Sequence, residues 1–172
     1  MNRLSATDYS AHDPGLFFSS IHGTLAHLLG AEHLWWHRLT GEKVAELDYS
    51  ELWALPAKDC GAAWEATAPD RGALAQNLRD QADRWVDLAD KADDDVLLSP
   101  VEYHDTEGNA TQLVLAAGLS QVFNHATHHR GQLTCALTRL GEDYATPDMQ
   151  RCGLGFLRYD PDGWLHANDT SG

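Results

Sequence analysis

The chain has little cysteine and no long apolar run. Its three cysteines, Cys60, Cys135 and Cys152, lie far apart and form no CxxC pair. We therefore expect reduced thiols in a cytoplasm and no disulfide framework. No apolar run approaches the roughly 20 residues of a transmembrane helix, and the polar residues 1–12 lack a signal-peptide core. These absences predict a cytoplasmic protein with no membrane partner.

Basic residues are scarce as well. Twelve Lys and Arg stand against 26 Asp and Glu, which gives a net charge of −14. Such a charge repels phosphate backbones and anionic lipid surfaces, so nucleic acid is not expected as a partner. The length of 172 residues suits one domain, and the hydrophobic content of 43% is that of an ordinary globular chain.

Three stretches show the apolar period of amphipathic helices, at about residues 16–39, 70–92 and 111–140. Residues 13–15 open the first, Asp70 is a possible N-cap of the second, and Gly141 closes the third. The remaining expected elements are a short helix near 49–54, an extended piece at 101–104 with a turn at 107–109, and a short helix at 147–157. The sequence thus predicts an all-α, up-and-down helical bundle as a single domain over 1–172, with the bundle at about 16–158 and a polar tail at 159–172.

Histidine is the residue type that stands out, with ten copies. His125 and His129 are about 40° apart on a helical wheel and lie in the apolar stripe of the third helix, so both should point into the core. Buried imidazoles need partners, and the His-x-x-x-His spacing lets both reach one metal ion from consecutive turns. Ala126 stands where a zincin metalloprotease carries its glutamate, which excludes that class.

A third ligand is expected from the first helix. His27 is the best candidate, because Gly23 and Ala31 lie one turn away on either side and let another helix approach closely. The other histidines are expected to be exposed or half-exposed: His12, His22, His33, His37, His104 and His166.

Three neutral imidazoles without a carboxylate suit a divalent transition metal, with Zn²⁺ or Ni²⁺ expected first and Fe²⁺, Co²⁺ or Mn²⁺ as the other candidates. At least one coordination position stays open, as in catalytic sites, where the ion activates a bound water or thiol. Three polar side chains of the third helix are candidates to hold the ligands in place or else to make ordinary contacts between helices: Asn124, His128 and Gln132.

Other side chains near these histidines in sequence carry two interpretations. Trp35, Trp36 and Phe123 either border a pocket or, as helical spacing favours, belong to the core. For Cys135 the wheel angle favours a small buried apolar residue, and whether it lies near the ion stays open.

Two segments resemble the DinB/YfiT-like family. They are residues 23–29 (GTLAHLL) continuing to 35–41 (WWHRLTG), and residues 122–132 (VFNHATHHRGQ), the more specific signature. The resemblance covers roughly residues 16–158. It implies a four-helix bundle that holds a divalent metal on three histidines, which in this chain are His27, His125 and His129. Relatives include thiol-dependent S-transferases and a mycothiol-dependent isomerase, and hydrolase activity is often proposed for the family.

The chain departs from the family at its start. Members usually have a further helix before the part that matches residues 15–18, where this chain has about a dozen polar residues. We expect the first bundle helix to be shortened or absent, and the tail or a partner chain in a homodimer to cover the apolar surface.

Three functions remain open from the sequence. The first is a metal-dependent enzyme, a hydrolase or thiol S-transferase acting on a small-molecule substrate with water or a low-molecular-weight thiol. The second is a non-enzymatic, metal-stabilised bundle for stress response or ligand binding, which a fourth protein ligand such as Glu32 would favour. In the third, the histidines hold no metal and only form hydrogen bonds.

Overall fold

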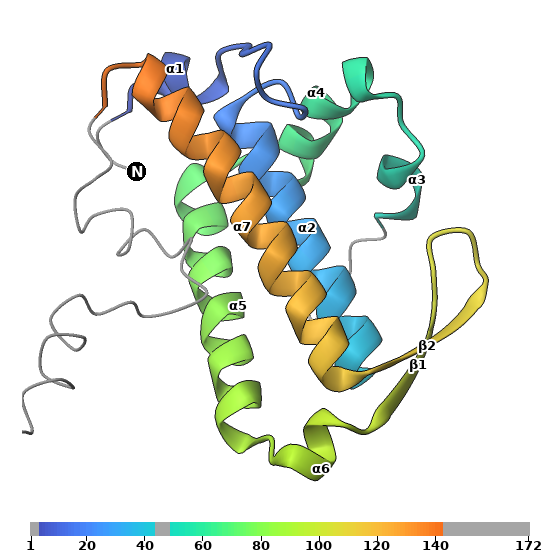
Figure 1. Cartoon of the computed structure of the whole chain (residues 1–172). Helices are drawn as coiled ribbons and strands as arrows, with labels where there is room; N and C mark the ends of the chain where they lie inside the picture. The colour runs from blue at the N-terminus through green and yellow to red at the C-terminus, as the bar shows by residue number, and fades with distance from the viewer. Residues whose placement is uncertain (1–3, 44–48, 143–172) are drawn as a thin grey trace, which may run out of the picture.

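The computed structural model describes residues 4–43 and 49–142 (Figure 1). Its three long helices are α2 (Ile21–Thr40), α5 (Arg71–Lys91) and α7 (Leu115–Arg139). The shorter elements are α1 (Ala6–Ser10), α3 (Ser50–Trp53), α4 (Ala57–Thr67), α6 (Asp94–Leu97), β1 (Pro100–His104) and β2 (Ala110–Val114). The predicted helical fold is confirmed, with a small two-stranded sheet added. The helix predicted at 147–157 and the tail at 159–172 lie outside the described residues.

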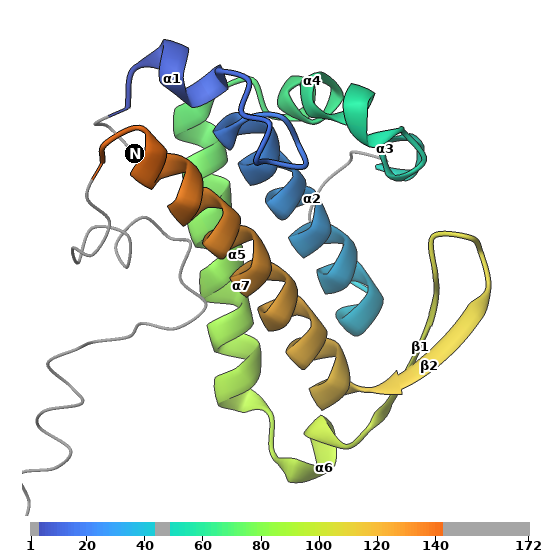
Figure 2. The same ribbon diagram turned by 45° about the horizontal axis from the view of Figure 1, so that its top comes forward.

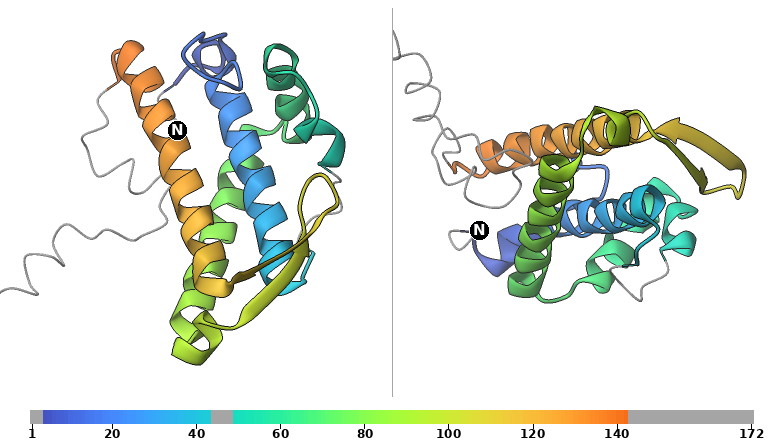
Figure 3. Two further views of the ribbon diagram at one scale, coloured as in Figure 1. Left: turned by 45° about the vertical axis from the view of Figure 1, so that its right-hand side comes forward. Right: turned by 90° about the horizontal axis from the view of Figure 1, so that it is seen from below.

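Helix α2 is the centre of the arrangement and packs against α4, α5 and α7. Seen from below, α2 lies between α7 on one side and α3 and α4 on the other (Figure 3). The chain runs down α2, back up through α3 and α4, down α5 and up α7, which is the predicted up-and-down order (Figure 1). Within residues 4–20 only the five-residue helix α1 precedes α2, so the shortened first helix is confirmed. Figure 2 shows α1 near the end of the bundle where α2 begins.

Helix α2 begins later than predicted. Its N-cap is Ser20, whose Oγ accepts the Gly23 N–H at 2.9 Å, whereas residues 13–19 form a loop closed by a bond from the Asp13 N–H to the Ser19 carbonyl. The predicted end of α2 and the predicted start of α5 are correct. Gly41 terminates α2 at φ 76°, a conformation that glycine adopts without strain. Asp70 caps α5 by accepting the Ala73 N–H.

A β-hairpin replaces the predicted start of the third helix. Strands β1 and β2 pair antiparallel, with Tyr103 opposite Thr111. Asp105 sets the turn, because its carboxylate accepts the backbone N–H groups of Glu107 and Asn109, each at 2.9 Å. The extended piece predicted at 101–104 is therefore confirmed. The helix start predicted at residue 111 is wrong, because residues 110–114 bond to β1 and α7 begins at Leu115.

Helix α4 has no equivalent in the sequence-based prediction. Its sequence AKDCGAAWEAT lacks a continuous apolar stripe, and its N-cap Pro56 offers no side-chain bond, so neither usual helix signal is present. Tertiary packing supplies what the local sequence does not. A Cβ on Gly61 would lie 2.7 Å from the Phe18 carbonyl oxygen, and Trp64 is 1% exposed in the core. The close approach to the start of α2 therefore requires a glycine on α4.

The core divides into an upper and a lower part along α2. The upper core, around Leu28, Trp64, Leu74 and Leu133, lies near α1 and α4. The lower core lies towards the hairpin and contains Trp36, Leu39, Trp85, Leu115, Leu119 and Val122. All three helices that the sequence predicts contribute buried apolar residues to these two parts.

Two burial predictions are wrong. Cys135 is exposed, on the outer side of α7. His22 is buried, because Tyr9 of α1 stacks on its ring and its Nε2 lies 2.8 Å from the Ala68 carbonyl oxygen at the end of α4. A helical wheel of α2 alone cannot show that α1 and α4 cover this face.

Gly30 should tolerate no side chain. A Cβ there would lie 2.5 Å from Cζ3 of the buried Trp64 and 3.2 Å from the Tyr49 ring. We expect Gly30→Ala to destabilise the fold by about 1–3 kcal/mol through overpacking, measured by urea unfolding. The matched control is Gly131→Ala on α7, where nothing lies within 4 Å and the better helix former should stabilise by about 0.5–1 kcal/mol. Equal effects of the two changes would contradict this packing argument.

Candidate metal centre

Three histidines converge between α2 and α7. The Nε2 atom of His125 lies 3.3 Å from Nε2 of His27 and 3.1 Å from Nε2 of His129. Within residues 4–43 and 49–142 these three form the one group of at least three potential metal ligands whose donor atoms lie within 4.8 Å of one another. The structure thus brings together the three residues that the sequence selects.

Local structure explains this convergence. His125 and His129 are one turn apart on α7, and α7 lies antiparallel alongside α2 (Figure 1). Ala26 and Ala126, next to the histidines in sequence, are buried and small. Gly23, in contrast, faces the loop before α2 and helix α4, since the atoms nearest to a Cβ there would be the carbonyl oxygens of Phe18 and Gly61. The small residue beside His27 therefore accommodates α4 and not the helix that carries the other two histidines.

Burial keeps these imidazoles neutral. His27 and His129 are 4% and 5% exposed, and His125 is half-buried. Desolvation lowers the pKa of His27 to about 2 and that of His129 to about 4, with the neighbouring histidines adding to both effects. Burial also lowers the pKa of His125. Neutral imidazole is the form that ligates metals, so the cluster needs no proton loss to accept an ion at neutral pH.

Gln132 fixes the tautomer of one histidine. Its Oε1 lies 2.8 Å from Nδ1 of His129, and an amide oxygen only accepts, so Nδ1 carries the hydrogen and Nε2 presents a lone pair. Nε2 of His125 lies near Nε2 of both His27 and His129, and a single N–H on it would serve only one of them well. A cation would satisfy all three lone pairs. Nitrogens about 2.0–2.1 Å from a tetrahedral Zn²⁺ lie about 3.4 Å apart, close to the spacing observed.

An aromatic wall encloses His27. Phe18 stacks on its ring with centroids 3.7 Å apart, and Trp53 and Trp64 meet it edge-on at 5.1 and 4.9 Å. None of the three was predicted as part of the site, because Phe18 precedes α2 and the two tryptophans lie on α3 and α4. The aromatic residues that the sequence did single out lie in or against the lower core, as helical spacing favours: Trp35, Trp36 and Phe123.

The other polar residues that the sequence proposed for the site differ in whether they contact the three histidines. Gln132 bonds to a site histidine, and the exposed His128 has its ring 5.0 Å from that of His129. Asn124 lies exposed on α7. Glu32 is outside the histidine group and instead accepts the Trp85 indole N–H. The fourth protein ligand that would close the site is thus not supplied by Glu32.

These features define a helical bundle protein with a buried three-histidine centre between two antiparallel helices. The model of the DinB family matches residues 1–152, so the chain belongs to the DinB family. No curated protein and no solved structure matches it. Among the described helices, none is long and apolar enough to cross a membrane.

Proposed function

We propose that this protein is a metal-dependent enzyme in which His27, His125 and His129 hold one divalent ion, Zn²⁺ or Ni²⁺ first among the candidates. The reaction is the attack of water or a low-molecular-weight thiol on a small-molecule substrate, as hydrolysis or thiol transfer. The observation that supports this is the convergence of three neutral imidazoles, with Nε2 of His125 lying 3.3 Å from Nε2 of His27 and 3.1 Å from Nε2 of His129. A set of three protein ligands leaves a position open for the nucleophile.

The chain's own residues shape the proposed site around that open position. When bound, the ion would lower the pKa of a coordinated water or thiol so that it is a nucleophile at neutral pH. Gln132 holds the His129 ring in its ligating tautomer. His125 is the least buried of the three, so the approach of substrate is expected from its side. Phe18 and Trp53 would exclude water from His27 and contact apolar parts of a substrate.

The test combines metal content with activity. Protein purified without a histidine tag should contain about one first-row metal ion per chain, lost in His125→Ala and kept in His128→Ala, whose exposed side chain lies on the same helix. The loaded protein should then transfer a low-molecular-weight thiol to an electrophilic substrate or hydrolyse an activated ester or amide. Metal without either activity would favour the alternative, a non-enzymatic metal-stabilised bundle. Absence of metal, with none taken up on titration, would exclude both.

Gln132→Leu should weaken metal binding without abolishing it. The substitution removes the acceptor for Nδ1 of His129 while leaving all three ligands in place. Loss of such a supporting bond typically lowers affinity about 10–100-fold, which a competition titration against a chromophoric chelator would measure. Asn124→Leu is the control, since Asn124 is exposed on the same helix. Equal affinities for the two variants would show that Gln132 makes only an ordinary contact.

A further inference from the structure

A separate cavity of about 370 Å³ lies between α2, Tyr49, the end of α4 and α5. Helix α2 contributes Leu29 and His33, which are about 160° and 120° around the helix from His27. The cavity and the histidine centre therefore lie on different sides of α2. Nothing in the proposed reaction uses this cavity.

Gln81 of α5 is the informative residue of its lining. The side chain is 2% exposed, and its amide Nε2 has no hydrogen-bond partner in the described part of the chain. Buried amide groups are almost always paired, because an unmade bond costs the full desolvation of the group. This nitrogen is closed off from solvent, so the amide must turn towards the adjoining cavity before an acceptor oxygen of an occupant can satisfy it.

Arg84 provides a positive charge one turn further along α5. Its guanidinium lies 3.8 Å from the Glu42 carboxylate, and both side chains are largely exposed, so that ion pair is weak and open to competition. The guanidinium is also close enough to His33 to help burial lower the pKa of that ring to about 4. His33 is therefore neutral and adds no second charge, while its Nδ1 lies 3.3 Å from the Tyr49 hydroxyl.

Four other lining groups are apolar or already bonded. Leu29 and Leu74 are buried side chains at the cavity wall. Asp70 and Asp80 also line it, but Asp70 accepts the Ala73 N–H and Asp80 accepts from the Gln76 amide, each at 2.6 Å. Both acids thus have donors within α5, whereas the Gln81 amide has no acceptor.

We propose that this cavity binds a small carboxylate. The Gln81 amide and the Arg84 guanidinium donate to its oxygens, and Leu29 and Leu74 contact its hydrocarbon part. The polar groups fix the orientation of the ligand, and the leucines set the size of the chain it carries.

The test is a titration of the ¹⁵N-labelled full chain with butyrate, followed by NMR. Saturable shifts are expected for the Gln81 side-chain amide and for the neighbouring backbone of α5. Butyramide and butylamine have the same chain length and should bind at least tenfold more weakly. No saturation by about 50 mM butyrate, or equal or tighter binding of butylamine, would overturn the proposal, the latter because it would identify Asp70 and Asp80 as the recognition groups.

Variants make the assignment specific. Arg84→Gln should weaken butyrate binding at least tenfold. Because the Arg84 side chain is exposed, the substitution should leave the fold intact, so unfolding would not explain the loss of affinity. Gln81→Leu should weaken it as well. Glu42→Gln should strengthen it severalfold, because the charge that competes for Arg84 is removed while the Trp36 indole keeps an acceptor. Butyrate binding unchanged by Arg84→Gln would overturn the proposal. His125→Ala should bind butyrate normally, so this result is independent of the metal centre.

Discussion

Adding Zn²⁺ or Ni²⁺ to the metal-free protein is expected to raise its unfolding temperature by about 8–16 °C. An ion present at about 1,000 times its dissociation constant stabilises the folded state by about 4 kcal/mol. For a chain of this size each kcal/mol shifts the midpoint by about 2–4 °C. His125→Ala should lose nearly all of the increase, because its Nε2 is the atom that lies near both other ligands. Differential scanning calorimetry with and without a chelator measures the effect.

The control for this prediction is His128→Ala. His128 neighbours His129 on α7 but is exposed and outside the three-histidine group. The variant should therefore keep the metal-induced increase. An increase of the same size in His125→Ala would mean that the ion binds elsewhere. No increase in the wild-type protein would leave a cluster of histidines that only form hydrogen bonds.

Two of the three histidines of the centre could be predicted from the sequence, because the helical period of the apolar residues shows which way their side chains point. His125 and His129 share the apolar stripe of α7, and a stripe must face a neighbouring helix. The selection of His27 had less support, since Gly23 beside it accommodates α4 and not α7. The resemblance to the DinB family selected the same residue independently. The prediction of a homodimer is tested by none of these contacts and stays a prediction.

The residues that surround the centre could not be predicted from the sequence in this way. Phe18, Trp53 and Trp64 reach His27 from a loop and two short helices, so their spacing in the sequence carries no common period. Helix α4 forms through packing against α2, and the same packing buries His22. Such features depend on contacts between elements and have no local signal. Only the first half of the hairpin was predicted from the sequence. The turn residues predict that the chain reverses direction, but they do not show how far the second strand extends.

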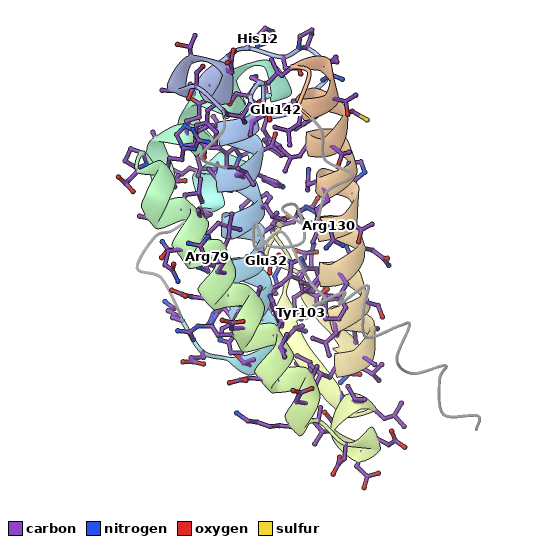
Figure 4. The ribbon with its side chains drawn as sticks, turned by 90° about the vertical axis from the view of Figure 1, so that its left-hand side faces the viewer. His12, Glu32, Arg79, Tyr103, Arg130 and Glu142 are labelled. Atoms are coloured by element: carbon purple, nitrogen blue, oxygen red, sulfur yellow. The ribbon has the colours of Figure 1, made fainter. Side chains whose placement is uncertain are left out.

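Glu32→Gln is expected to stabilise the protein progressively as the pH rises. Glu32 is 4% exposed on α2 and lies on the same side of the bundle as Arg130 of α7 (Figure 4). Burial raises the pKa of Glu32 from 4.5 to about 8, although the Trp85 hydrogen bond and the charge of Arg130 act in the opposite direction. Because the folded-state pKa exceeds that of the unfolded chain, the stability from the protonated carboxyl is complete below about pH 4.5 and is lost as the pH rises through about 8.

The glutamine variant removes this dependence. Glutamine is neutral at every pH and keeps an oxygen that accepts the Trp85 indole N–H. At about 1.4 kcal/mol for each pKa unit, the variant should match the wild-type protein near pH 4.5 and exceed it by about 5 kcal/mol at pH 9. Urea unfolding at pH 5, 7 and 9 in the presence of a chelator measures the difference without a contribution from bound metal. Glu102→Gln on the exposed edge of β1 is the control and should show no such trend. A stability difference for Glu32→Gln that does not change with pH would mean that this carboxyl is ionised in the folded protein throughout the range, with Arg130 compensating its burial.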